Sequence, residues 1–154
     1  MTVYDPDIAL EQVAAGLKQV AFDPIPGLNG YDYPPSVPVL DAGIVHPPEI
    51  NYRESMNLGV IRLEFELHLI VGSSAGHQQQ MSLWKYLNWA GPQSILALID
   101  ADPSLGIVGG DGEPRVDAHV IGASRPLTLE ELPSLETMTF GAAVPVTVLV
   151  TNKE

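Results

Sequence analysis

Apolar and polar residues alternate most regularly between Val60 and Val71. The apolar members are Ile61, Leu63, Phe65, Leu67, Leu69 and Val71, and between them stand Val60, Arg62, Glu64, Glu66, His68 and Ile70. A period of two predicts a β-strand with one face in the core. Because the second face is mostly charged, the pattern favours an antiparallel sheet wetted on one side over a buried parallel sheet.

Three segments have helical spacing. The first runs from Asp5-Pro6-Asp7 to Val20, with a capping aspartate and a proline suited to the first helical position, and Pro24 follows it. A second helix is predicted from Gly76 to Ala90 and a third from Pro92 through Ile99. The expected apolar stripe of the second helix is Met81, Trp84, Leu87 and Gly91, with Leu83 and Ala90 beside it.

Three further strands complete the pattern. One lies between Tyr31 and Val45, where Pro38 marks an edge or irregular strand and His46-Pro47-Pro48 ends it. Val116 to Val120 and Met138 to Thr151 also alternate, with Pro145 at an edge or bulge. This order predicts an α+β fold, a single domain over residues 1–154: a mainly antiparallel four-stranded sheet with amphipathic helices packed on one face.

The composition narrows the function classes. The chain has 154 residues, 19 acidic and 7 basic, for a formal net charge of −12. A surface this acidic repels phosphate and anionic lipid, so tight nucleic-acid binding is not expected. The absence of cysteine excludes disulfides, thiolate metal sites and cysteine nucleophiles. The first seven residues lack a basic region and no apolar run is long enough to span a membrane, so we expect neither a secretory signal nor a membrane partner.

One string resembles a catalytic motif. Residues 72–76, Gly-Ser-Ser-Ala-Gly, fit the G-x-S-x-G pattern between a strand and a helix. Ser74 would be the nucleophile and His119 the base, and the orienting carboxylate would be Asp102, Asp111 or Asp117. However, the preceding strand carries charge on one face and the chain is short for a hydrolase fold. We therefore interpret the string as a connector and expect no enzyme.

The remaining polar residues do not form a recognised metal or cofactor motif. The four histidines, His46, His68, His77 and His119, have neither helical i, i+4 spacing nor a zinc pattern, and we interpret them as surface or satisfied residues. A facing pair of His68 and His119 on neighbouring strands is the one pairing considered. The glycine-rich, acidic segment 106–112 lacks the lysine and following helix of a phosphate loop. We expect no cofactor and no metal.

Two groups of residues have both a structural and a functional interpretation. Arg62, Glu64 and Glu66 line the polar face of the long strand, where they are either simply solvated or part of a subunit interface or charged lumen wall. Trp84 and Trp89 are interpreted as core residues rather than interface residues, although large aromatics serve both roles.

The order of these elements resembles that of a known family. The stretch from Ala90-Gly91-Pro92-Gln93-Ser94-Ile95 to Leu105-Gly106 is similar to the tail terminator (tail completion) proteins of siphophages that infect actinobacteria, in which a G-P-x-S-[IV] turn starts a helix that ends in an acidic Leu-Gly loop. The flanks agree: Pro26-Gly27-Leu28 follows the first helix, Val71-Gly72 ends the long strand, and an amphipathic strand closes the chain. The resemblance extends from about Ile8 to Thr151.

The resemblance implies a structural virion protein at the neck of the tail, assembled in the host cytoplasm. Such proteins form a ring, typically a hexamer, on the last ring of the tail tube protein, and offer a docking face to the head–tail connector or stopper. DNA passes through the lumen without specific binding, which an acidic wall would favour. The candidate inter-subunit or lumen-facing residues are Arg53, Arg62, Glu64, Glu66 and Arg125.

The sequence leaves three alternatives open. The chain is otherwise another neck protein, such as a head-completion stopper or adaptor. A small serine hydrolase that uses Ser74 is the alternative from another class. A generic acidic binding module is the last. Three loops are expected to order on assembly, at residues 51–57, 72–80 and 125–136.

Overall fold

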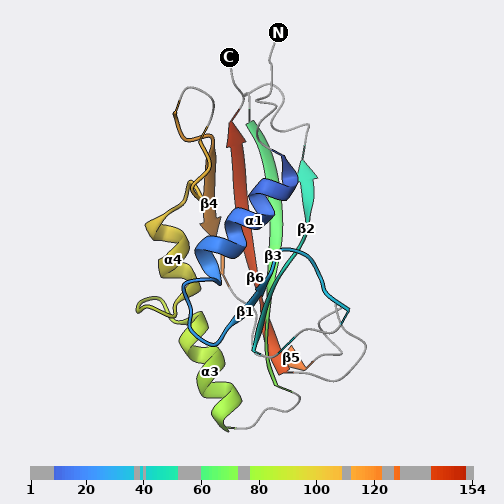
Figure 1. Ribbon diagram of the computed structural model, residues 1–154, viewed down its shortest axis with the longest axis vertical. Coiled ribbons are helices and arrows are strands. Elements are labelled where there is room, and N and C mark those ends of the chain that lie inside the picture. Colours follow the sequence, from blue (N-terminus) through green and yellow to red (C-terminus); the bar gives the residue numbers. More distant parts are fainter. Residues whose placement is uncertain are drawn as a thin grey trace.

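The computed structural model describes residues 9–36, 39, 41–51, 60–72, 77–108, 112–122, 127–128 and 140–151 (Figure 1). Its helices are α1 (Leu10–Ala21), α3 (His77–Leu87) and α4 (Ile95–Ala101). Its strands are β1 (Asn29–Tyr31), β2 (Ala42–Asn51), β3 (Val60–Gly72), β4 (Val116–Val120), β5 (Leu127–Thr128) and β6 (Phe140–Thr151). The predicted capping residues Asp5 to Asp7 lie outside the described residues. Within those residues, no helix has the length and apolarity that crossing a bilayer requires.

The strands form one mixed sheet in the order β1-β2-β3-β6-β4. The short β5 also pairs with β6, at Phe140 and Gly141. β1 and β2 run parallel, with Asn29 opposite Ala42, and every other pairing is antiparallel. The longest ladder joins β3 to β6, from Val60 opposite Thr151 to Gly72 opposite Phe140. The two most regular segments of the sequence are therefore neighbours at the centre of the sheet.

The predicted mainly antiparallel four-stranded sheet is wrong, although the α+β class is retained. The sheet has two additional short strands, and one of its edges is parallel. β1 has three residues and β5 has two, which is too short for an alternating pattern to be seen in the sequence. Their pairing depends on where the connections return the chain, and that is tertiary information.

β2 also lies later in the chain than expected. The prediction ended a strand at Val45, whereas β2 continues through Pro47 and Pro48 to Asn51, with a register shift between His46 and Glu49. β1 pairs only with residues 42–44 of β2, so the prolines lie where no described strand pairs with that edge of β2. A bulge on an open edge tolerates the missing N–H groups. Val37, Pro38 and Leu40 lie outside the described residues.

Pro145 is tolerated near the centre of the sheet for a related reason. β4 ends at Val120, opposite Val146, and beyond it the Ile121 amide donates to the Pro145 carbonyl at 3.1 Å. The N–H and carbonyl of a strand residue point to the same side, so the missing N–H of Pro145 falls just past the end of the β4 ladder. The predicted edge or bulge is thus the end of a neighbouring strand.

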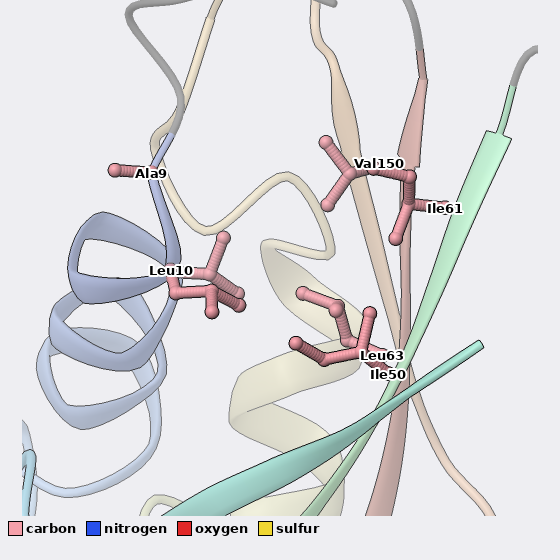
Figure 2. Close-up of a pocket in the computed structure, with 7 residues that line it drawn as sticks. Ala9, Leu10, Ile50, Ile61, Leu63 and Val150 are labelled. Carbon is pink, nitrogen blue, oxygen red and sulfur yellow. The ribbon is translucent and has the colours of Figure 1, made fainter. Parts of the chain in front are cut away.

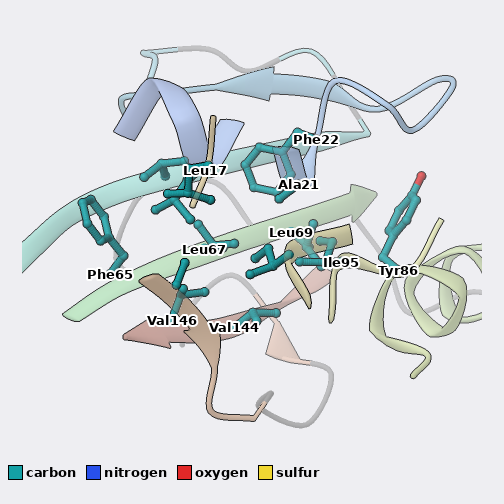
Figure 3. Packing of buried hydrophobic residues seen from close by; sticks show 14 of the residues in the cluster. Leu17, Ala21, Phe22, Phe65, Leu67, Leu69, Tyr86, Ile95, Val144 and Val146 are labelled. Carbon is teal, nitrogen blue, oxygen red and sulfur yellow. The ribbon is translucent and has the colours of Figure 1, made fainter. Parts of the chain in front are cut away.

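The main core lies between one face of the sheet and the helices (Figure 3). We call this the inner face. From the helices it receives Val13, Leu17, Ala21, Leu83, Tyr86, Ile95 and Ile99, and from the sheet Leu63, Phe65, Leu67, Leu69, Val116, Ala118, Val144, Val146 and Val148. Of the predicted apolar residues of β3, Leu63, Phe65, Leu67, Leu69 and Val71 are confirmed as core, and Ile61 packs against them partly buried. Phe22, just after α1, completes the packing, and its ring lies against Gly43, where a Cβ would come within 2.7 Å.

α4 begins at Ile95 rather than at the predicted Pro92. The N-cap is Ser94, whose hydroxyl oxygen accepts from the Ala97 amide at 3.1 Å and whose hydroxyl donates to the Asn88 carbonyl. These two bonds fix the turn between α3 and α4 and satisfy a helix-end amide. α4 ends at Ala101, two residues beyond the predicted Ile99, and Asp102 is its C-cap.

Candidate functional site

The outer face of β3, opposite the core, carries the predicted charged residues. The Arg62 guanidinium lies 2.8 Å from a Glu64 carboxylate oxygen, and both side chains are about half exposed. Glu66 is also exposed, and its carboxylate reaches the buried His68 ring at 2.5 Å. The structure therefore brings Arg62, Glu64 and Glu66 together on one face, whereas the other two candidates, Arg53 and Arg125, lie outside the described residues.

The neighbouring strand adds a third glutamate to this face. Glu49 of β2 is directly opposite Glu64 of β3, and Asn51 is opposite Arg62. Like charges at directly opposite positions of a sheet destabilise it, by a few tenths of a kcal/mol up to about 1 kcal/mol. Glu49, Glu64 and Glu66, which we call the acidic row, are therefore an arrangement that the fold alone does not favour. The sequence did not reveal Glu49, because its partner is set by the β2 bulge.

Beside the acidic row, two histidine rings stack. His46 of β2 and His68 of β3 have ring centroids 3.8 Å apart, and His68 is 1% exposed. Burial lowers the pKa of His46 to about 4, with the nearby His68 adding to the shift and Glu66 opposing it. The His46 Nε2 is buried without a hydrogen-bond partner among the described residues. At neutral pH the His46 ring is therefore uncharged.

The histidine pairing differs from the one considered from the sequence. His119 of β4 lies opposite Thr147 of β6, away from His68. Its ring contacts the Asp117 carboxylate at 2.8 Å on an exposed surface. His68 instead lies opposite Ile44 and Ala143. The interpretation of the histidines as surface or satisfied residues missed the stacked pair. The signal that could have found it is the register of β2 on β3, which the sequence alone does not fix.

Farther along, the outer face is dry rather than charged. Ala42, Ile44 and Ile70 are fully buried there, with Tyr31 and Ala143 packed against them. The predicted wetted face of β3 is thus wet only in its first half. Ile70, which the alternation placed with the polar residues, belongs to this second small core, and His68, opposite Ile44, is buried beside it.

The residues of the hydrolase alternative do not converge. Asp117 and His119 are hydrogen-bonded, as a triad would require. However, His119 is opposite Thr147 of β6, whereas the Gly72 end of β3 is opposite Phe140, seven residues away along the same strand. At 3.3 Å per residue that is roughly 23 Å. Ser74 lies outside the described residues. Within the part of the chain that the structure describes, three or more potential metal ligands do not gather anywhere.

An apolar groove lies between the start of α1 and the sheet (Figure 2). It has a volume of about 110 Å³ and is lined by Ala9, Leu10, Val13, Ile50, Ile61, Leu63 and Val150. Every lining residue is apolar, so the groove could bind an apolar group but supplies no acid, base or nucleophile.

The core interpretation of the two tryptophans is wrong. Trp84 is 55% exposed and Trp89 is 81% exposed, and Met81 on the same face of α3 is 41% exposed. The helix turns Leu83 and Tyr86 to the core instead, and the Tyr86 hydroxyl donates to Asp41 at 3.0 Å. Burial and, after it, the charge of Asp41 raise the pKa of Tyr86 well above its usual value. The predicted stripe was one position out of phase, because α3 carries apolar residues on two faces.

The two exposed tryptophans lie in the lining of a surface hollow. Met81, Trp84, Lys85, Leu87, Asn88 and Trp89 line a space of about 410 Å³. We call this set the α3 patch. An exposed apolar patch with two tryptophans is typical of a protein interaction site. No protein-family model and no curated protein matches the chain.

Proposed function

We propose that the chain is a structural subunit of a phage tail, a tail terminator that closes the tail tube as a ring and presents a docking face to the head connector. The proposal starts from the resemblance between residues 90–106 and that family. The residues that carry the resemblance form the turn capped by Ser94, helix α4 and the turn at Leu105, which is a coherent local unit. Under this hypothesis the chain acts through its binding surfaces and not through an active site.

The acidic row is the observation that supports this function best. Glu49 and Glu64 face each other directly, and Glu66 lies next to them on the exposed half of the outer face. Such a row costs stability and is expected where function requires negative charge. DNA passing a ring lumen needs a wall that its phosphates do not bind, because each bound phosphate would slow sliding. The acidic row facing the lumen would provide that wall.

Deletion of the gene tests the proposal directly. Heads should form normally, while tails should exceed their normal length, because tube polymerisation would lack its stop. Electron microscopy of the particles measures this. Tails of normal length would overturn the terminator reading, and placement of the chain between portal and stopper would assign it to another neck component.

The lumen role has its own test. Replacing all three glutamates of the row by lysine should leave tail length unchanged but slow DNA ejection, because lysines would hold phosphate. The matched control replaces the same glutamates by glutamine, which removes the charge without adding a phosphate ligand. Ejection that is equally fast in the wild type and the lysine variant would place the row away from the DNA path.

A further inference from the structure

We infer that the α3 patch binds a second copy of this chain at the exposed residues Tyr33, Ser36 and Val39, which we call the receiving edge. This inference rests on the proposed ring and names the surfaces that would meet in it. A closed ring needs a head-to-tail contact between two different surfaces of the subunit. In Figure 1, α3 lies at the lower left of the sheet and the chain after β1 turns out to the right, before Asp41 accepts a hydrogen bond from Tyr86 of α3.

The size of the α3 patch fits the centre of an interface. A tryptophan side chain offers roughly 150–250 Å². Trp89 and Trp84 therefore present on the order of 250 Å² of aromatic surface at their observed exposures. A specific contact buries roughly 800 Å² on each partner, and aromatic anchors at its centre carry most of the affinity. The patch is thus an anchor within a larger contact.

Charge distinguishes a second copy from other partners. Residues 67–99 contain no aspartate or glutamate, and Lys85, within the patch, is their only lysine or arginine. Residues 19–52 show the reverse composition, with the four acids Asp23, Asp32, Asp41 and Glu49 and neither lysine nor arginine. In a chain of net charge −12, the α3 patch has a lysine and no acid among its lining residues, so a second acidic copy can approach it with little repulsion.

The receiving edge is exposed but held in place. Tyr33 is 63% exposed and Val39 is 61% exposed. The Val39 amide donates to the Tyr31 hydroxyl at 3.0 Å, and the Asn29 side-chain amide donates to the carbonyls of Val39 and Asp41, each at 3.2 Å. An apolar side chain fixed in this way loses little freedom on binding. Asp32, next to Tyr33, supplies a negative partner for Lys85.

Cross-linking between two single-cysteine variants tests the contact, because the wild-type chain has no cysteine. Ala90→Cys places a thiol beside Trp89, and Ser36→Cys places one between Tyr33 and Val39; both positions are exposed. Mixed at high concentration with a short bismaleimide, the two variants should give a covalent heterodimer. Val108→Cys, at an exposed apolar site that lines neither surface, is the control and should not cross-link to Ser36→Cys.

Charge reversal makes the test specific. Lys85→Glu in the Ala90→Cys chain should lower the cross-linking yield several-fold, and Asp32→Lys in the Ser36→Cys chain should restore it. Absence of the heterodimer would overturn the inference, as would cross-linking of Ala90→Cys mainly to itself, which indicates a two-fold contact.

The inference and the proposed function fail separately. Normal tail length after gene deletion, with the heterodimer still formed, would refute the terminator role but support the contact. Overlong tails after deletion, without the heterodimer, would support the terminator role and refute this contact.

Discussion

The two faces of β3 carry the same alternation but have different surroundings. On the inner face, Leu63, Phe65, Leu67 and Leu69 are all buried, in the core that also contains residues of the three helices. On the outer face, Glu64 and Glu66 are exposed, whereas His68 and Ile70, on the same face, are buried. A period of two tells which residues share a face. It does not tell what covers that face, and the boundary between the wet and dry halves falls where the two histidines stack.

The inner face of β3 contributes mainly to the stability of the fold, whereas the exposed half of its outer face is available for function. The inner face is where folding free energy is gained, since burial of apolar side chains dominates it. The exposed half of the outer face gains little from solvated charges and loses some through the opposed glutamates. Substitutions on the two faces should therefore differ sharply in their effect on the free energy of unfolding.

The largest effect is expected on the inner face. Phe65→Ala removes a ring that is 2% exposed, and should lower the free energy of unfolding by about 3–5 kcal/mol. Its neighbour Glu64, on the outer face, is the matched control, and Glu64→Ala should cost less than about 1 kcal/mol because the ion pair with Arg62 is half exposed. Urea unfolding of both variants measures the contrast. Equal losses would mean that the outer face is covered too.

A second substitution tests the pairing of β3 with β6. An added Cβ at Gly141 of β6 would lie 1.9 Å from the Leu69 carbonyl oxygen, which is backbone and cannot move aside alone. Gly141→Ala should therefore cost about 1–3 kcal/mol, the range for overpacking. At Gly122, an added Cβ meets no atom within 4 Å, so Gly122→Ala should stay within about 0.5 kcal/mol. A Gly141→Ala chain as stable as the wild type would contradict the β3–β6 register.

The contrast also explains what the sequence could and could not predict. β3 and β6 were predictable because long alternation with one apolar face leaves few other structures. The stacked His46 and His68 were not, because their approach depends on the register of β2 on β3, in which Ile44 lies opposite His68 and His46 opposite Glu66. Trp84 was misplaced because α3 has two apolar faces, and only packing against the sheet decides which one is buried. β1 and β5 were too short to leave a pattern.

The histidine stack should make the boundary sensitive to pH. The pKa of His46 is about 4 in the folded chain and about 6.5 in an unfolded one. The folded state therefore binds a proton less readily, so the His46 contribution to stability is complete above pH 6.5 and is lost as the pH falls toward 4. Between pH 7 and pH 5 the loss should be on the order of 1 kcal/mol, since partial exposure screens the shift.

His46→Phe provides the measurement, because it keeps an aromatic ring against His68 and removes the titrating group. Urea midpoints at pH 7 and pH 5 should differ less in this variant than in the wild type. The neighbouring His68 and Glu66 are common to both chains, so the difference isolates His46. Identical pH dependence in the two chains would show that the His46 ring is solvated and free to accept a proton.

The smallest effect concerns the acidic row. Glu49→Gln removes one of two opposed charges and leaves the Arg62–Glu64 pair intact, so it should stabilise the chain by a few tenths of a kcal/mol. Glu64→Gln relieves the same repulsion but also loses the pair, so its net effect should be near zero. If Glu49→Gln raises the free energy of unfolding, Glu49 does not contribute to the stability of the fold, and its negative charge serves another purpose. A loss in Glu49→Gln, measured against Glu64→Gln at low salt, would mean that the glutamates are structurally paired, and the acidic row would no longer support a lumen wall.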